Sequence, residues 1–235
     1  MEEIEIKDCS LVFFYGTIKM VLYMKLEDLN VKYDKLQKKY GAKELRSIYN
    51  GGCIDNPDIC FVFMNPTGKN VASLMSWEGI RSPWIGTKVI WGLFYELGLL
   101  DCNIYQKIRN RKGSEWTPDF ALEVYNDIAK HKVFITNLGK CTQIDARPLP
   151  DSVYKEYLDL LYKEFEIIKP KVIVLFGNQV SSIVLDEKIS VSNCRKKEFN
   201  KNGYKFYSVF YPVGNGRFNI DKSIEDIKYI MNDIL

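Results

Sequence analysis

Hydrophobic and polar residues follow two rhythms along this chain. Short runs of β-branched and aromatic residues predict strands, at 59–64, 133–136, 172–176 and 204–210. Apolar residues at helical spacing predict helices, at 26–40, 84–100, 120–130 (or an irregular excursion), 151–168, 179–185 and 221–234. Because strands alternate with helices, we predict parallel βαβ units in a single three-layer α/β/α domain with a central, mainly parallel sheet.

The first 25 residues do not follow this alternation. Their apolar stretch, 11–24, contains Lys19 and is too short for a membrane span. The acidic start of the chain is opposite in charge to the start of a signal peptide. We predict one or two strands, or a hairpin that turns near Tyr15 and Gly16. Residues 1–25 are therefore expected to form an N-terminal strand or extension, and residues 26–235 the main domain.

Charge and cysteine content narrow the function classes. The chain has 33 basic and 30 acidic residues, a net charge of +3, which neither requires nor excludes a polyanionic partner. The six cysteines include no C-x-x-C pair, which argues against a zinc ribbon and favours free thiols in a reducing cytoplasm. Two basic clusters are either solvated faces or phosphate contacts. They comprise Lys107, Arg109, Arg111 and Lys112, and Arg195, Lys196, Lys197, Lys201 and Lys205.

The sequence gives little support for a metal site, a catalytic triad or a phosphate-binding loop. His131 is the single histidine and has no obvious partner, so a serine or cysteine triad has no base. The acidic residues show no metal-ligand spacing, and we predict no metal site. Gly68 and Lys69 follow a strand, but a phosphate-binding loop requires glycine where Phe63 stands and Ser or Thr where Asn70 stands.

Two predicted strands end in asparagine. Asn65 follows the strand at 59–64 and is held out of the helical region by Pro66, and Asn137 follows the strand at 133–136. Ligands of open α/β sheets bind at the carboxyl ends of the strands. A carboxamide both donates and accepts hydrogen bonds. The two side chains therefore predict a pocket for an amide-like ligand such as a nucleobase.

Two further features stay open on composition alone. The loop at 211–217 is glycine-rich, so it is either a surface turn or a backbone that approaches a ligand or DNA phosphate closely. Trp84 follows Pro83 and belongs either to the core or to a face on which a base stacks.

Several segments, in this order, resemble the uracil-DNA glycosylase superfamily, and most closely its iron–sulfur class. Residues 64–66 (Met-Asn-Pro) resemble its water-activating motif, and 83–86 (Pro-Trp-Ile-Gly) the element whose aromatic ring stacks on the base. Residues 134–141 resemble the motif whose Asn recognises uracil, 168–177 a characteristic strand, and 211–217 the closing motif. The resemblance spans about residues 26–220 and implies the uracil-DNA glycosylase fold.

The resemblance implies a role for each matching residue. Asn65 would orient water and Tyr211 would offer its hydroxyl to the departing base, although a hydrophobic role for Tyr211 is equally open. The base would contact Met64, Pro66, Trp84 and Asn137. DNA phosphates would be held by residues of two loops. These are Lys140, Gly214, Asn215, Gly216 and Arg217.

The chain also departs from the family pattern. Tyr211 replaces the histidine of the closing motif, Val213 its serine, and Phe63 the leading glycine of the first motif. Cys141 matches one iron–sulfur ligand, but Tyr157 stands near the position of the next. One cysteine cannot hold a four-iron cluster, so we predict no cofactor.

The implied function is a DNA glycosylase that hydrolyses the N-glycosidic bond of a flipped, deaminated base, uracil first, in base excision repair. The alternative is a catalytically weak or inactive member that binds nucleobases or nucleic acid. Apart from Val213 and Phe218 the closing loop has no large apolar wedge, which favours single-stranded DNA or DNA with a damaged or mismatched base. We expect a cytoplasmic, nucleoid-associated monomer without membrane contact.

Overall fold

The computed structural model describes residues 10–14, 17–21, 24–146 and 149–234. Within them, a central sheet has six strands in the order β3-β5-β4-β6-β8-β7. The strands are β3 (Gly51–Gly52), β4 (Ile59–Phe63), β5 (Val133–Asn137), β6 (Val172–Phe176), β7 (Glu198–Lys201) and β8 (Tyr204–Val209). The four inner strands are parallel, and β3 and β7 pair antiparallel at the edges. The mainly parallel sheet is confirmed.

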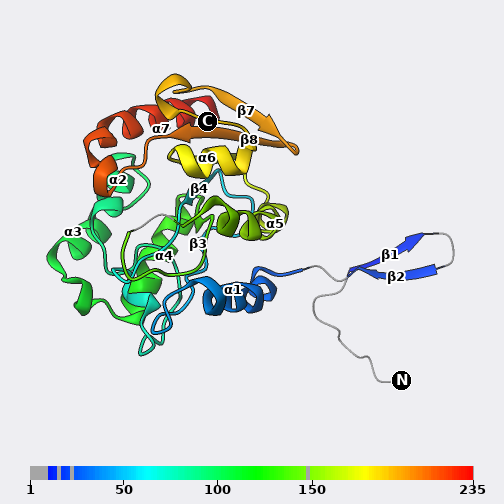
Figure 1. Ribbon diagram of the computed structural model, residues 1–235, viewed down its shortest axis with the longest axis horizontal. Helices are drawn as coiled ribbons and strands as arrows, with labels where there is room; N and C mark the ends of the chain where they lie inside the picture. Colours follow the sequence, from blue (N-terminus) through cyan, green and yellow to red (C-terminus); the bar gives the residue numbers. More distant parts are fainter. Residues whose placement is uncertain (1–9, 15–16, 22–23, 147–148, 235) are drawn as a thin grey trace.

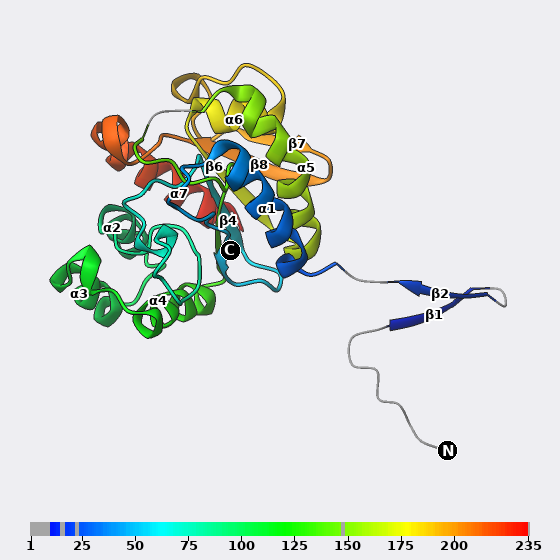
Figure 2. The same ribbon diagram turned by 60° about the horizontal axis from the view of Figure 1, so that its bottom comes forward.

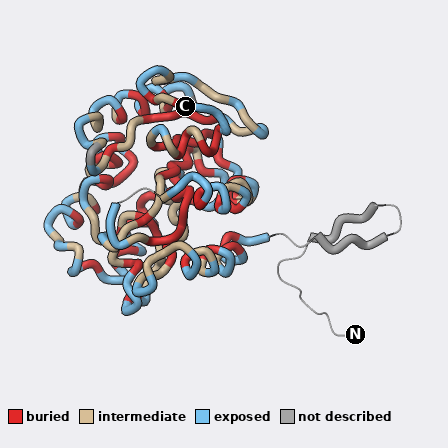
Figure 3. Tube along the Cα trace, viewed as in Figure 1, coloured by how far each residue is buried: buried red, intermediate tan, exposed pale blue. Residues whose placement is uncertain are grey.

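Helices cover both faces of this sheet (Figures 1 and 2). They are α1 (Leu26–Tyr40), α2 (Val89–Glu96), α3 (Cys102–Asn110), α4 (Pro118–Lys130), α5 (Asp151–Ile168), α6 (Asn178–Leu185) and α7 (Ile220–Ile234). In β4, Phe61 and Phe63 face the core formed with α2, α3, α4 and α7, whereas Cys60 and Val62 face the core formed with α1, α5 and α6. This alternation produces two buried layers and confirms the three-layer prediction. Figure 3 colours the buried residues red.

The predicted helix at 84–100 is wrong at both ends. Trp84 (φ 67°) and Gly86 (φ 86°) adopt left-handed backbone, so a helix cannot form before Val89. Gly98 (φ 70°) separates α2 from α3, a helix that the sequence analysis missed. Strand β7 was also missed, although Asn202-Gly203 is a strong hairpin-turn signal.

The N-terminal segment forms a separate hairpin of β1 (Ser10–Phe14) and β2 (Thr17–Val21), paired antiparallel. The predicted turn at 15–16 lies outside the described residues. The boundary between residues 1–25 and the main domain stays a prediction. Among the described helices, none combines the length and the apolar character that crossing a membrane requires.

Candidate active site

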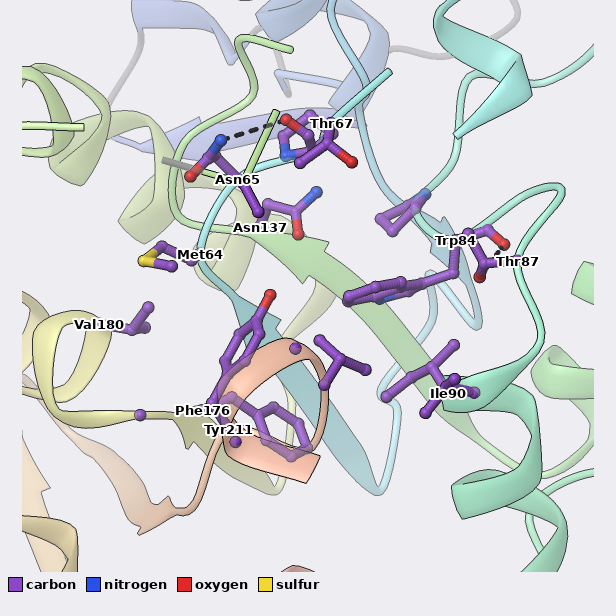
Figure 4. Close-up of a pocket in the computed structure, with 18 of the residues that line it drawn as sticks. Met64, Asn65, Thr67, Trp84, Thr87, Ile90, Asn137, Phe176, Val180 and Tyr211 are labelled. Atoms are coloured by element: carbon purple, nitrogen blue, oxygen red, sulfur yellow. Dashed lines mark hydrogen bonds between the residues drawn. The ribbon is translucent and has the colours of Figure 1, made fainter. Parts of the chain in front are cut away.

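A cavity of about 640 Å³ opens at the carboxyl ends of β4, β5 and β6 (Figure 4). It is also lined by the segment before α2, the start of α6 and the loop after β8. Eight of the predicted site residues line it: Met64, Asn65, Pro66, Trp84, Asn137, Tyr211, Gly214 and Gly216. Among the described residues that line the cavity, none is Asp, Glu or His, and Lys69 is the one charged side chain.

Strand pairing brings the two asparagines to one edge of the sheet. Phe63 of β4 lies opposite Asn137 of β5 in the parallel register. Beyond the strands, the N–H groups of Leu138 and Gly139 donate to the carbonyls of Phe63 and Met64, both at 2.8 Å. The backbones that carry Asn65 and Asn137 are therefore fixed to each other.

The carboxamide of Asn65 is held at both ends. Its Nδ2 donates to the carbonyl oxygen of Pro66 at 3.1 Å, the dashed line in Figure 4. Its Oδ1 accepts a hydrogen bond from the hydroxyl of Tyr154 at 2.6 Å. The sequence analysis missed Tyr154 as a site residue, because its position on helix 151–168 marks only the apolar face.

Asn137 presents an unpaired polar group to the cavity. The residue is 2% exposed, and its Nδ2 has no hydrogen-bond partner among the described residues. In Figure 4 its carboxamide points into the cavity. Burying such a donor without a partner costs about 1–3 kcal/mol. A ligand with a hydrogen-bond acceptor would remove this cost.

Aromatic rings form one wall of the cavity. The Trp84 ring meets Phe63 edge-on at 5.0 Å between centroids, and Phe63 stacks on Phe176 at 4.3 Å. The left-handed backbone of Trp84 is fixed because its carbonyl accepts hydrogen bonds from Thr87 Oγ1 (2.8 Å) and Trp91 Nε1 (3.2 Å). Phe63, at the position of the family's glycine, thus supports the indole.

Tyr211 reaches the cavity from the loop after β8, and its hydroxyl points inward in Figure 4. Its ring meets Phe63 edge-on at 6.3 Å. Burial raises the pKa of Tyr211 above its ordinary value, because the apolar surroundings disfavour the phenolate. The hydroxyl is consequently a neutral hydrogen-bond donor at physiological pH.

The structure corrects the prediction that Lys140 contacts DNA phosphate. Lys140 is 1% exposed, and its ammonium pairs with the fully buried Glu164 at 3.0 Å. It also donates to the carbonyl oxygen of Asn137 at 2.9 Å and to Thr136 Oγ1. Desolvation lowers the pKa of Lys140, and Glu164 opposes that shift. Through its hydrogen bond to the Asn137 carbonyl, Lys140 stabilises the backbone at that position, and its buried ammonium group cannot reach DNA.

The closing loop forms a 3-10 helix, Gly214–Asn219, at the mouth of the cavity. Arg217 is exposed there, with its guanidinium over the ring of Phe218, which is 79% exposed. The side chain of Asn215 lies outside the described residues. Lys69, which the sequence analysis had considered only for a phosphate loop, is an exposed cation on the cavity wall.

The residues present do not fit a four-iron cluster. Cys141 is buried against the hydroxyl of Tyr157, and no three described cysteines come together as ligands.

A different group of possible metal ligands lies close together: Asp101, Asp127 and His131 place their ligand atoms within 4.8 Å of one another. His131 therefore has the partner that the sequence did not indicate. Asp127 accepts the N–H of Asp101, and Asp101 Oδ1 lies 3.1 Å from His131 Nε2, so contacts within the group account for its proximity.

Comparison with known families adds one finding. A family model described as the Uracil DNA glycosylase superfamily matches residues 52–231. The match includes both asparagine-bearing strand ends, the Trp84 segment and the loop after β8.

Proposed function

Since the chain belongs to the uracil DNA glycosylase superfamily, we propose that it removes a deaminated base, uracil first, from DNA by hydrolysing the N-glycosidic bond. The observation that carries the proposal is the pairing of Asn65 and Asn137 in one cavity whose described lining has no Asp, Glu or His. A base within a duplex cannot reach such a cavity, so the nucleotide must flip or already be single-stranded.

Base recognition follows from the groups that face the cavity. The unpaired Nδ2 of Asn137 donates to a carbonyl oxygen of the base, and its Oδ1 accepts the base's N3–H. Trp84 offers an aromatic face for stacking. Uracil presents both a carbonyl and an N–H on one edge, and this complementarity supports it as the first candidate.

Bond cleavage proceeds without a general base. Asn65 orients a water molecule toward C1′ of the deoxyribose, but it cannot take its proton at neutral pH. The glycosidic bond therefore breaks first, and the base leaves with the bonding electron pair. Water then adds to the oxocarbenium-like sugar, and its proton passes to solvent or to the departed base. Tyr211 donates its hydroxyl hydrogen bond to the base anion.

The test is excision from oligonucleotides that carry uracil, hypoxanthine or xanthine, single-stranded and in duplexes, followed by alkaline cleavage of the abasic site. Cleavage by the wild type, lost in Asn65→Ala prepared identically, supports the proposal and identifies the base. Binding of these oligonucleotides without cleavage at enzyme excess would favour the alternative, a member that binds nucleobases without this chemistry.

Trp84→Ala is expected to raise KM for a uracil-containing single strand about 10- to 100-fold, because stacking on an aromatic ring contributes about 1–3 kcal/mol per base. Trp84→Phe keeps a stacking face and should lose much less. Steady-state kinetics on the two variants measure the effect. Equal KM values for the wild type and Trp84→Ala would exclude a stacking role.

Excision should not decline between pH 7 and pH 10 through ionisation of Tyr211. Burial raises the pKa of this phenol, so its proton is retained above the ordinary value near 10 and the donor persists over this range. Tyr211→Phe should lower kcat about 10-fold at every pH, the value of one hydrogen bond. A pH–rate profile of both proteins checks this; a wild-type rate that falls to the variant's rate below pH 10 would contradict it.

A further inference from the structure

We propose that Tyr154 is a positioning residue that orients the Asn65 carboxamide for its water, an inference that rests on the proposed function. Tyr154 lies in α5 and does not line the cavity. Its hydroxyl reaches Asn65 Oδ1 at 2.6 Å, the shorter of the two hydrogen bonds that hold this side chain. Tyr154 therefore acts on the reaction through Asn65.

The packing around Tyr154 holds its hydroxyl against Asn65. Tyr154 is fully buried, and its ring lies against Gly139 in the turn that follows β5. A Cβ at Gly139 would lie 3.0 Å from the Tyr154 ring and 3.5 Å from Asn65 Cβ. The phenol, the turn and the asparagine thus pack against one another.

The hydrogen bonds define which way the amide faces. An asparagine carboxamide can turn over and exchange its oxygen and nitrogen with little change in shape. A phenol hydroxyl donates to the oxygen, and the Pro66 carbonyl accepts from the nitrogen, so both contacts favour the same orientation. Among the described residues Tyr154 is the one donor to Oδ1, which leaves a lone pair for water. This lone pair accepts a hydrogen from water and leaves the water oxygen free to attack C1′.

The donor must stay protonated for this role. Burial raises the pKa of Tyr154 because the apolar surroundings disfavour the phenolate. The hydroxyl therefore stays protonated and donates to Asn65 at neutral pH. The geometry of the hydrogen bond, rather than titration, carries the role.

Tyr154→Phe removes only the hydroxyl and leaves Asn65 Oδ1 without its partner. We expect kcat for uracil excision to fall about 10- to 100-fold, with KM unchanged, because one unmet hydrogen bond is worth about 1–3 kcal/mol. The matched control is Tyr157→Phe, a buried tyrosine on the same helix that lies against Cys141. It should keep the wild-type kcat.

A double-mutant cycle distinguishes positioning from general support of the fold. In the Asn65→Ala background, Tyr154→Phe should cause no further loss under single-turnover conditions. Should the residual rate be too low to measure, the NMR signal of the Asn65 side-chain amide must shift in Tyr154→Phe and not in Tyr157→Phe. A wild-type kcat in Tyr154→Phe, or the same loss in both backgrounds, would overturn the inference while excision by the wild type stands. No excision by the wild type would instead remove the proposed function, and Tyr154's role with it.

Discussion

Asn65→Ala is expected to lower the rate constant of base excision at least about 100-fold, because a water that is misplaced by about an ångström already reduces the rate by that factor. The cavity lining holds no Asp, Glu or His among the described residues, so no carboxylate or imidazole there can act as a base in place of a water oriented by Asn65. Single-turnover excision of uracil from an oligonucleotide measures the change.

Asn65→Ala should lose excision activity without a matching loss of affinity for DNA. Asn65 is half-buried at the strand end, and the groups proposed to recognise the base, Asn137 and Trp84, remain in place. The dissociation constant for uracil-containing DNA should therefore stay within a few-fold of the wild type. Asn126→Ala, an exposed asparagine on α4, is the matched control and should keep full activity. An active Asn65→Ala would show that water is activated elsewhere.

Lys140→Met is expected to destabilise the protein by about 3–5 kcal/mol, the usual effect of leaving a buried charge without its partner. Glu164 is fully buried and receives hydrogen bonds from Tyr33 (3.0 Å), Asn50 (2.8 Å) and Thr136 (2.7 Å) as well as from Lys140. These neutral donors cannot neutralise the carboxylate. Urea denaturation measures the free energy of unfolding.

Removing the second charge should reverse part of this loss. In Lys140→Met/Glu164→Gln the amide keeps an acceptor for Tyr33 and Asn50 and no longer carries a charge, so we expect at least about 1–2 kcal/mol to return. The salt dependence of DNA binding tests whether Lys140 is instead a phosphate contact. A stable Lys140→Met protein with a weaker salt dependence would mean that Lys140 contacts phosphate after all.

The two asparagines could be found in the sequence because each stands where a strand formed by local propensity stops. Parallel strands align such ends at one edge of the sheet, so their proximity follows from topology. The prediction for Lys140 was wrong because the sequence alone does not show that Glu164 is its partner. Glu164 lies in helix α5 and becomes a neighbour of Lys140 only in the folded core. A lysine without a visible partner is naturally expected in solvent.

Tyr154 escaped the sequence analysis for a related reason. The apolar stripe of its helix depends on the aromatic ring, whereas its contribution to the site depends on the hydroxyl, whose partner is on another strand end. Trp84 was identified by its neighbours in the sequence, but its left-handed backbone was not, since hydrogen bonds from Thr87 and Trp91 support that conformation. Local pattern located these residues, and hydrogen bonds to residues outside each pattern determined their geometry.

The lack of Asp, Glu and His among the described residues that line the cavity has a consequence for substrate choice. Departure of a purine from its sugar is normally assisted by protonation of the ring, and a buried phenol with a raised pKa is a poor acid for that purpose. Uracil can leave as a resonance-stabilised anion that needs only hydrogen bonds. We therefore expect excision rates to follow the acidity of the departing base, so that substituents such as 5-fluoro accelerate the reaction. Selectivity would then arise from leaving-group ability as much as from the shape of the cavity.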